Sequence, residues 1–240
     1  MPPSGEPRGP VEPPPSTIAF PPAATADDKG CVLDGGDLEP GTLLAAYRSG
    51  LFPMRRSTGE WTWLSPDPRG ILPVGEIHVT KSLRRSLRRF ETTVDSAFAA
   101  VVDACADRAE DEYLWLTPDI RAAYCRLHDL GWAHSVETWE PAADGEPRRL
   151  VGGLYGIAVG GLFSGESMFH RETDASKVAL VALGEVLAAD ARDREHRIID
   201  VQWLTPHMAS LGAVEIPREE YLSRLERALE LPPPPAFRSG

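Results

Sequence analysis

The clearest hydrophobic pattern in the chain lies between positions 150 and 211. Two apolar, glycine-rich runs meet at Gly160-Gly161, and this predicts two strands joined by a tight turn. The segment that follows Asp174 is apolar nearly all round, as expected of a buried helix, and Asp174 is placed to be its N-cap.

A third predicted strand carries polar groups into this apolar region. The β-branched residues Ile198, Ile199 and Val201 are interleaved with Asp200 and Gln202. Burying an unpaired carboxylate costs several kcal/mol or more. Asp200 and Gln202 therefore indicate a candidate functional site on this strand.

Elsewhere the pattern predicts a series of helices and strands. Helical spacing occurs over 40–49, 81–89, 95–106, 118–130 and 217–229, and strand-like alternation over 60–63 and 134–139. This order indicates an α+β fold with a mixed, mostly antiparallel sheet. We expect a small N-terminal domain over 17–72, a break near Pro73 and a larger domain over 73–231. The proline-rich ends, 1–16 and 232–240, are expected to be disordered or extended.

Composition narrows the class of protein without identifying it. With 240 residues and 42% hydrophobic content, the chain can bury one large core or two unequal ones. No apolar run has the length of a membrane span and no signal sequence is visible, so a cytoplasmic protein is expected. Cys31, Cys105 and Cys125 lack CxxC spacing, and the histidines show no ligand spacing, so we expect reduced thiols and no metal.

One basic segment stands out against a net charge of −11. Lys81, Arg84, Arg85 and Arg88 are spaced at i, i+3, i+4 and i+7, so a helix places them on one side, with Arg89 close by. A solvated helix face is the simpler interpretation. The acidic background favours a phosphate-binding face.

The common catalytic and cofactor signatures do not occur. The sequence contains neither the GxSxG nucleophile motif nor the GxxxxGK[ST] phosphate loop. Its glycines near 152–165 form neither GxGxxG nor the pyrophosphate loop of acetyl-CoA-dependent transferases. No cofactor is therefore expected.

Several short motifs, taken together and in order, resemble one known family. They are IAFP (18–21), GGDL (35–38), GLFP (50–53), SPDPR (65–69), VGGLYG (151–156), FSGESMF (163–169), ASK (175–177), DVQ (200–202) and SLGA (210–213). This set resembles the bacterial leucyl/phenylalanyl-tRNA–protein transferases over about residues 18–229. The resemblance implies a GNAT-like acyltransferase domain after the small N-terminal domain. It also implies transfer of Leu or Phe from aminoacyl-tRNA to proteins with N-terminal Arg or Lys, marking them for degradation, without metal, CoA or a covalent intermediate.

The resemblance also implies roles for particular residues. Gln202 would orient the attacking amine and Asp200 would support it, either as a base or by positioning. Glu166 would pair with the basic acceptor residue; otherwise it is a surface charge. An aminoacyl side chain would lie among residues that could equally be ordinary core: Leu154, Gly165, Met168, Leu180, Leu183, Leu187 and Ile199.

For the donor, the basic segment would hold tRNA phosphates and Trp115 would stack on adenosine. The sequence departs from many family members at Met54 and Leu64, where they carry Trp. The expected partners are Leu-tRNA, Phe-tRNA and the acceptor protein, with the enzyme a monomer. Two alternatives remain: a CoA-dependent N-acyltransferase, and a non-catalytic adaptor that binds tRNA or basic N-termini.

Overall fold

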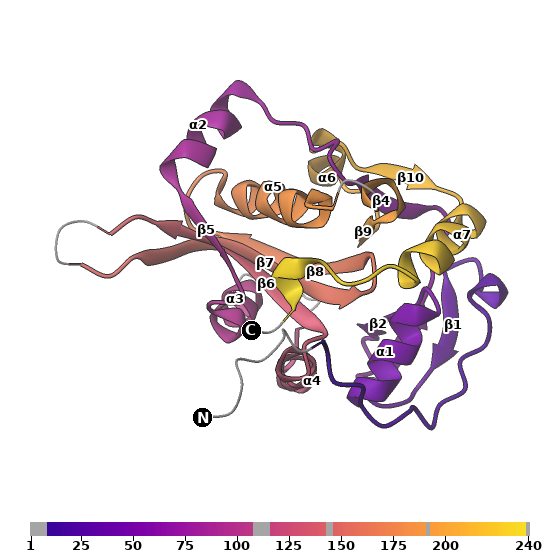
Figure 1. Cartoon of the computed structure of the whole chain (residues 1–240). Coiled ribbons are helices and arrows are strands. Elements are labelled where there is room, and N and C mark those ends of the chain that lie inside the picture. The colour runs from indigo at the N-terminus through magenta and orange to yellow at the C-terminus, as the bar shows by residue number, and fades with distance from the viewer. Residues whose placement is uncertain (1–8, 108–115, 143–145, 191–192, 239–240) are drawn as a thin grey trace, which may run out of the picture.

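The strands form two sheets of unequal size. The computed structural model describes residues 9–107, 116–142, 146–190 and 193–238 (Figure 1). The smaller sheet has the order β1-β3-β2, all antiparallel. Its strands are β1 (Cys31–Asp34), β2 (Phe52–Arg55) and β3 (Trp61–Leu64), and helix α1 (Pro40–Arg48) packs beside them.

The larger sheet has seven strands in the order β10-β4-β9-β8-β7-β6-β5. Its β8–β9 pair is parallel, and the other pairs in the described residues are antiparallel. The strands are β4 (Arg69–Pro73), β5 (Glu91–Val94), β6 (Ala133–Glu140), β7 (Arg149–Val159), β8 (Leu162–His170), β9 (Ile198–Gln202) and β10 (Val214–Ile216). The α+β class with a mixed, mostly antiparallel sheet is thus confirmed.

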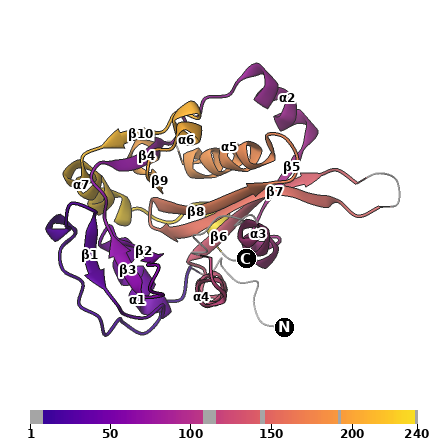
Figure 2. The same ribbon diagram turned by 180° about the vertical axis from the view of Figure 1, so that it is seen from behind.

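Helices cover both faces of the larger sheet (Figures 1 and 2). Helices α3 (Phe98–Ala106) and α4 (Pro118–Asp129) lie on one face, and α5 (Ala175–Ala188) lies on the other. Helix α2 (Lys81–Arg89) packs on α5, and α6 (Pro206–Ser210) and α7 (Arg218–Leu229) follow β9 and β10 in the chain. The apolar core therefore consists of separate layers on the two sides of the sheet.

The hairpin of β7 and β8 forms where the sequence predicts it. Gly160 has φ +60°, and a Cβ there would lie 2.7 Å from the Ala228 carbonyl oxygen, so the turn requires glycine. On β7, a Cβ on Gly152 would lie 2.6 Å from the Cβ of Ala175, so this glycine allows α5 to pack directly on the strand. Asp174 does precede α5, but its side chain makes no capping hydrogen bond and instead pairs with Lys177.

The expected break near Pro73 falls at the end of β4, a strand that belongs to the larger sheet. The proline-rich sequence before Arg69 indicates only a turn. Pairing with β9 and β10 makes the following residues a strand, and that pairing is not encoded locally.

The proline-rich ends contact the rest of the protein in the parts that the structure describes. Phe237, in a short 3-10 helix (Pro235–Phe237), is only 2% exposed and stacks on His134 at 4.2 Å between ring centroids. At the other end, the Trp132 indole donates to the Val11 carbonyl oxygen at 2.8 Å. Proline-rich segments lack a repeating apolar pattern, yet one aromatic ring or carbonyl group is enough to dock them.

Candidate active site

Strands β8 and β9 separate in the middle of the larger sheet. Their parallel register ends at Ser164 opposite Asp200. Each strand then has a register shift against its outer neighbour: Glu166 is the extra residue in β8 and Val201 the extra residue in β9. Bulges of this kind redirect side chains, and they are frequent beside active sites.

Asp200 is the carboxylate that the sequence places in an apolar strand, and it is fully paired. It is 1% exposed and forms a bidentate ion pair with Arg69, Nε to Oδ1 at 2.9 Å and Nη2 to Oδ2 at 2.6 Å. The Tyr221 hydroxyl donates to Oδ2 at 2.9 Å and the Gln202 backbone N–H donates to Oδ1 at 3.0 Å. Both oxygens are therefore occupied by hydrogen-bond donors.

The Arg69 guanidinium that pairs with Asp200 is itself enclosed. It lies over the rings of Phe52, at 4.8 Å, and Tyr221, at 4.4 Å. Burial is the largest single effect and would lower the pKa of Arg69. The charge and hydrogen bonds of Asp200, together with Tyr221 and Glu166, outweigh it, so the pKa lies above its usual value. Removing either partner would leave a buried charge unpaired, at a cost of about 3–5 kcal/mol.

Gln202 connects this ion pair to a second polar group. Its backbone has φ +58°, an uncommon conformation for a residue other than glycine. Its side-chain Nε2 donates to the Ser164 hydroxyl at 2.9 Å, and Ser164 donates to Glu166 Oε1 at 3.1 Å. The family resemblance implies that Gln202 orients the attacking amine and that Glu166 pairs with the acceptor residue. Ser164 brings these two side chains together.

Glu166 lies in a cage of hydroxyl groups. Tyr47 donates to Oε1 and Tyr124 donates to Oε2, each at 2.9 Å, while the two tyrosine oxygens lie 3.0 Å apart. Burial raises the pKa of Glu166 to about 7, although the hydroxyl donors oppose the shift. Burial and the nearby Glu166 charge raise the pKa of both tyrosines well above 10, so they remain donors.

The residues predicted to form the aminoacyl pocket lie together in the core layer against α5. All of the following are at most 4% exposed: Leu154, Leu180, Leu183, Leu187 and Ile199. Met168 packs against this cluster from a partly buried position. A Cβ on Gly165 would meet only the Asp200 carbonyl oxygen, at 3.6 Å, so space is open beside this residue. The assignment of the cluster to an aminoacyl side chain stays a prediction.

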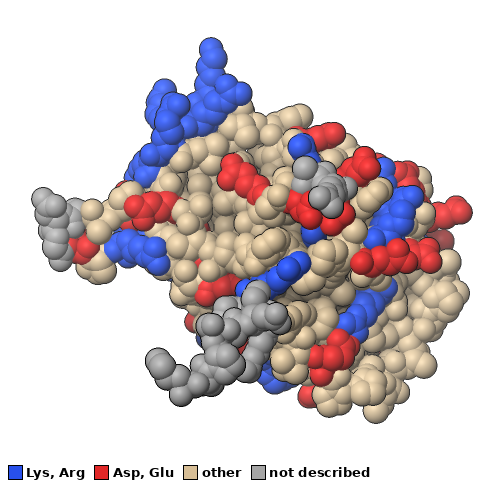
Figure 3. Space-filling model, in the orientation of Figure 1, with Lys and Arg blue, Asp and Glu red and all other residues tan. Residues whose placement is uncertain are grey.

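The basic segment forms α2, with the bounds that the sequence predicts. Thr80 caps it, accepting from the Leu83 N–H at 3.2 Å, and Leu83 is the side chain that anchors the helix in the core. The exposed cations project from one end of the molecule (Figure 3). Within the described parts of the chain, no carboxylate forms an ion pair with Lys81, Arg84, Arg85 or Arg88.

Arg89 is an exception to the predicted five-cation face. It pairs with Glu140, on β6, at 2.7 Å and with Glu172, just after β8, at 3.3 Å, so acidic side chains already neutralise it. The sequence could not indicate this, because these carboxylates lie 51 and 83 residues away in the chain. The predicted phosphate-binding face is therefore reduced to the other cations of α2.

Of the aromatic positions, Trp115 lies outside the described residues. Met54 is partly buried on β2, and Leu64 is partly buried on β3. Trp203 follows Gln202 directly and is 43% exposed, with its ring held edge-on against Phe52 at 5.0 Å. An exposed, braced aromatic ring beside Gln202 is a surface on which a planar group can stack.

Sequence reasoning missed the residues that hold the site together. In the sequence, Arg69 is only the end of a proline-rich turn, and Ser164 is only part of a motif. Tyr47, Tyr124 and Tyr221 occupy ordinary apolar positions of helices. Buried tyrosines at helix positions facing a sheet have no special spacing, so no local pattern could have identified them. The site that results brings together a carboxylate, a hydroxyl and a primary amide, and groups of these kinds can pair with a cation and with an amine.

Comparison with known proteins identifies the class to which the chain belongs. Residues 71–226 match a family model described as "Leucyl/phenylalanyl-tRNA protein transferase", and residues 36–67 match the N-terminal domain model of the same description. A leucyl/phenylalanyl-tRNA–protein transferase from Azoarcus sp. (strain BH72) is 50% identical over 227 residues, covering 92% of each chain. Similar relatives come from Thiobacillus denitrificans, 49% identical over 89% of this chain and 91% of its own, and Idiomarina loihiensis, 44% over 93% and 92%.

These matches place the chain among the transferases. It belongs to the leucyl/phenylalanyl-tRNA–protein transferase family, as the sequence motifs predicted. Among the described residues, no helix has both the length and the apolar character needed to cross a bilayer.

Proposed function

We propose that this protein transfers Leu or Phe from aminoacyl-tRNA to the α-amino group of a protein whose first residue is Arg or Lys. The observation that carries the proposal is the Gln202–Ser164–Glu166 chain at the point where β8 and β9 separate. In this chain the Gln202 amide can bind the free amine of an acceptor, and the Glu166 carboxylate can bind the acceptor's basic side chain. Family membership supplies the donor.

In this reaction the acceptor amine attacks the ester carbonyl carbon of the aminoacyl group. A C–N bond forms, the C–O bond to the ribose oxygen breaks, the amine loses a proton and the ribose hydroxyl gains one. Because the ester is already activated, placing the amine correctly supplies a large part of the rate. Gln202 positions the amine, and Glu166 attracts the cationic acceptor side chain.

Asp200 fits a positioning role better than a base. Four donors already occupy its oxygens, including the bidentate guanidinium of Arg69. Taking a proton would break a buried ion pair that is worth about 3–5 kcal/mol when disrupted. Asp200 instead fixes the backbone of Gln202 through the N–H bond to Oδ1.

The donor would contact both α2 and Trp203. The cations of α2 that have no ion-pair partner in the described part of the chain attract tRNA phosphates despite the acidic surface elsewhere. Trp203, next to Gln202, presents a ring on which the terminal base of the donor stacks.

Transfer of labelled Leu from Leu-tRNA to a protein with N-terminal Arg tests the proposal. We expect transfer that depends on tRNA, proceeds without CoA, and falls about 10- to 10⁴-fold in Gln202→Ala with unchanged tRNA affinity. Turnover of acetyl-CoA without tRNA would instead favour an N-acyltransferase. Normal binding of both partners without transfer would favour an adaptor.

A further inference from the structure

The Ser164 hydroxyl joins two side chains that have different hydrogen-bonding capacities. Ser164 is fully buried and lies 2.9 Å from Gln202 Nε2 and 3.1 Å from Glu166 Oε1. A serine hydroxyl has one proton to donate, and an ionised carboxylate can only accept. Ser164 must therefore donate to Glu166 and accept from its other neighbour.

This arrangement determines which end of the Gln202 amide faces Ser164. Only the NH₂ end can donate, so the carbonyl oxygen Oε1 must face away from Ser164. Within the described residues, that oxygen accepts no hydrogen bond. It is the end of Gln202 that can accept a hydrogen bond from an incoming N–H group.

We propose that Ser164 is a positioning residue which, through its bond to ionised Glu166, keeps the Gln202 amide carbonyl turned toward the acceptor amine. The inference rests on the proposed function, and it adds that Glu166 controls Gln202 as well as attracting the acceptor. When Glu166 is protonated, it can donate to Ser164, Ser164 can donate in turn, and the Gln202 amide is free to reverse. An amide presenting its NH₂ end would repel the amine hydrogens.

The other groups around Glu166 do not change the direction of the hydrogen bonds from Gln202 to Ser164 and from Ser164 to Glu166. Tyr47 and Tyr124 both direct their hydroxyl groups at the carboxylate, and burial raises the pKa of each well above 10. Asp200 lies nearby on β9, but its oxygens are bound to Arg69, Tyr221 and the Gln202 backbone. Ser164 is thus the link through which the charge on Glu166 reaches the Gln202 side chain.

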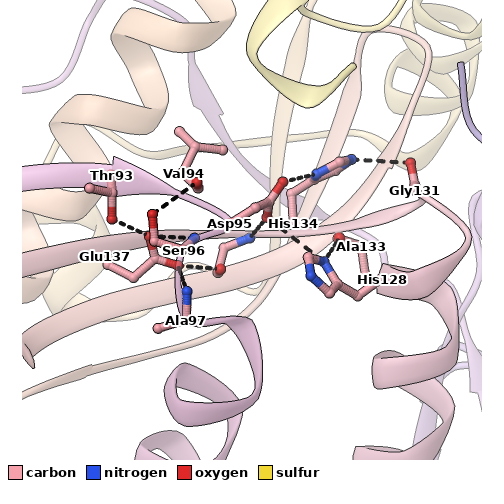
Figure 4. A network of polar contacts seen from close by, with 11 residues as sticks. Thr93, Val94, Asp95, Ser96, Ala97, His128, Gly131, Ala133, His134 and Glu137 are labelled. Carbon is pink, nitrogen blue, oxygen red and sulfur yellow. Dashed lines mark hydrogen bonds and ion pairs between the residues drawn. The ribbon is translucent and has the colours of Figure 1, made fainter. Parts of the chain in front are cut away.

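A matched control exists elsewhere in the same sheet. Ser135 on β6 is also fully buried and donates to a buried carboxylate, Glu137. Glu137 accepts in addition from Thr93 and from the backbone N–H groups of Ser96 and Ala97, at the start of α3 (Figure 4). Ser135→Ala therefore removes the same kind of bond without touching Gln202.

The first test does not depend on catalysis. The side-chain amide of Gln202 is followed by ¹H–¹⁵N NMR over a pH titration across the pKa of Glu166, about 7, with its signals assigned by their loss in Gln202→Ala. We expect these signals to shift as Glu166 titrates in the wild type and in Ser135→Ala. In Ser164→Ala the shift should be absent. Signals that titrate equally in Ser164→Ala, or that never titrate in the wild type, would overturn the inference even if the protein transferred no amino acid.

The second test uses the transfer reaction. Ser164→Ala should lower kcat about 10- to 100-fold, as expected from misplacing a reacting group, with KM for aminoacyl-tRNA unchanged. Ser164→Cys, which keeps a weak donor and acceptor at the same place, should recover part of the loss. In a Gln202→Ala background, Ser164→Ala should change kcat less than about twofold, because the residues act as one unit. Independent losses in the double variant would contradict the positioning role, whereas absence of transfer in the wild type would contradict only the proposed function.

Discussion

Replacing Glu166 by Gln removes a carboxylate whose charge state changes close to neutral pH. Burial raises the pKa of Glu166 from 4.5 to about 7, against the opposing effect of three hydroxyl donors. Binding a cationic acceptor residue requires the ionised form. The wild-type kcat/KM for an acceptor with N-terminal Arg should therefore increase as pH rises through about 7.

The magnitude follows from the fraction of Glu166 that is ionised. With a pKa of about 7, that fraction is about one tenth at pH 6 and about nine tenths at pH 8. The acceptor amine also loses its proton over part of this range, in the wild type and in the variant alike. The ratio of kcat/KM between wild type and Glu166→Gln cancels that contribution, and it should rise about tenfold from pH 6 to pH 8.

Relative to Glu166→Gln, the free energy of unfolding of the wild type should fall over the pH range in which its relative kcat/KM rises. Because the pKa is raised in the folded state, ionisation of Glu166 costs the fold about 3 kcal/mol, at about 1.4 kcal/mol for each pKa unit. The protonated form of Glu166 stabilises the fold relative to the ionised form. This contribution is fully present below the unfolded-state pKa of 4.5 and is lost as pH rises through the folded-state pKa of about 7. Urea unfolding should therefore show Glu166→Gln gaining stability relative to the wild type between about pH 5 and pH 8.

The assay is single-turnover transfer of labelled Leu at a series of acceptor concentrations, from about pH 6 to pH 8. Glu215→Gln, which removes an exposed carboxylate from β10, provides the control and should leave the profile unchanged. A kcat/KM ratio that is the same at both ends of this range would refute the reasoning. Glu166 would then be a structural carboxylate whose charge does not take part in acceptor binding.

Three further predictions concern other parts of the molecule. Replacing Arg84, Arg85 and Arg88 of α2 together by Glu should weaken tRNA binding. The slope of log affinity against log salt concentration should decrease in magnitude by about 0.7–0.9 for each tRNA phosphate that these cations neutralise. An unchanged slope would mean that this face of α2 is only solvated. Trp203→Ala should raise KM for aminoacyl-tRNA about 5- to 100-fold, and Trp203→Phe less, if a base stacks there; equal KM values in all forms would exclude it. Phe237→Ala should lower the free energy of unfolding by about 3–5 kcal/mol, measured by urea titration; no loss would mean that the C-terminal segment is not docked in solution.

The local elements of this protein could be predicted from the sequence. Helix α2 occupies the predicted residues, and the β7–β8 hairpin turns at the predicted glycines. Hydrophobic periodicity and glycine placement act over a few neighbouring residues, so they can be recognised without knowledge of the fold. The ordered motifs identified the family, and the matches over 36–67 and 71–226 confirm it.

The partners of the polar side chains were decided by the tertiary structure. Asp200 stands out in the sequence as a carboxylate in an apolar strand, but its partner Arg69 is 131 residues earlier in the chain. Glu166 could be taken from the sequence as a lone surface charge, and its altered pKa arises because the fold partly buries it against Tyr47 and Tyr124, 119 and 42 residues away.

The same physical reason separates what could be predicted from what could not. A residue type and its local spacing determine what a side chain is able to donate, accept or bury. The environment that sets its charge and orientation comes from segments that meet only when the sheet assembles. Thus the sequence by itself determined that Asp200, Gln202 and Glu166 are candidates for the site, and the separation of β8 from β9 decided that Ser164 joins Gln202 to Glu166.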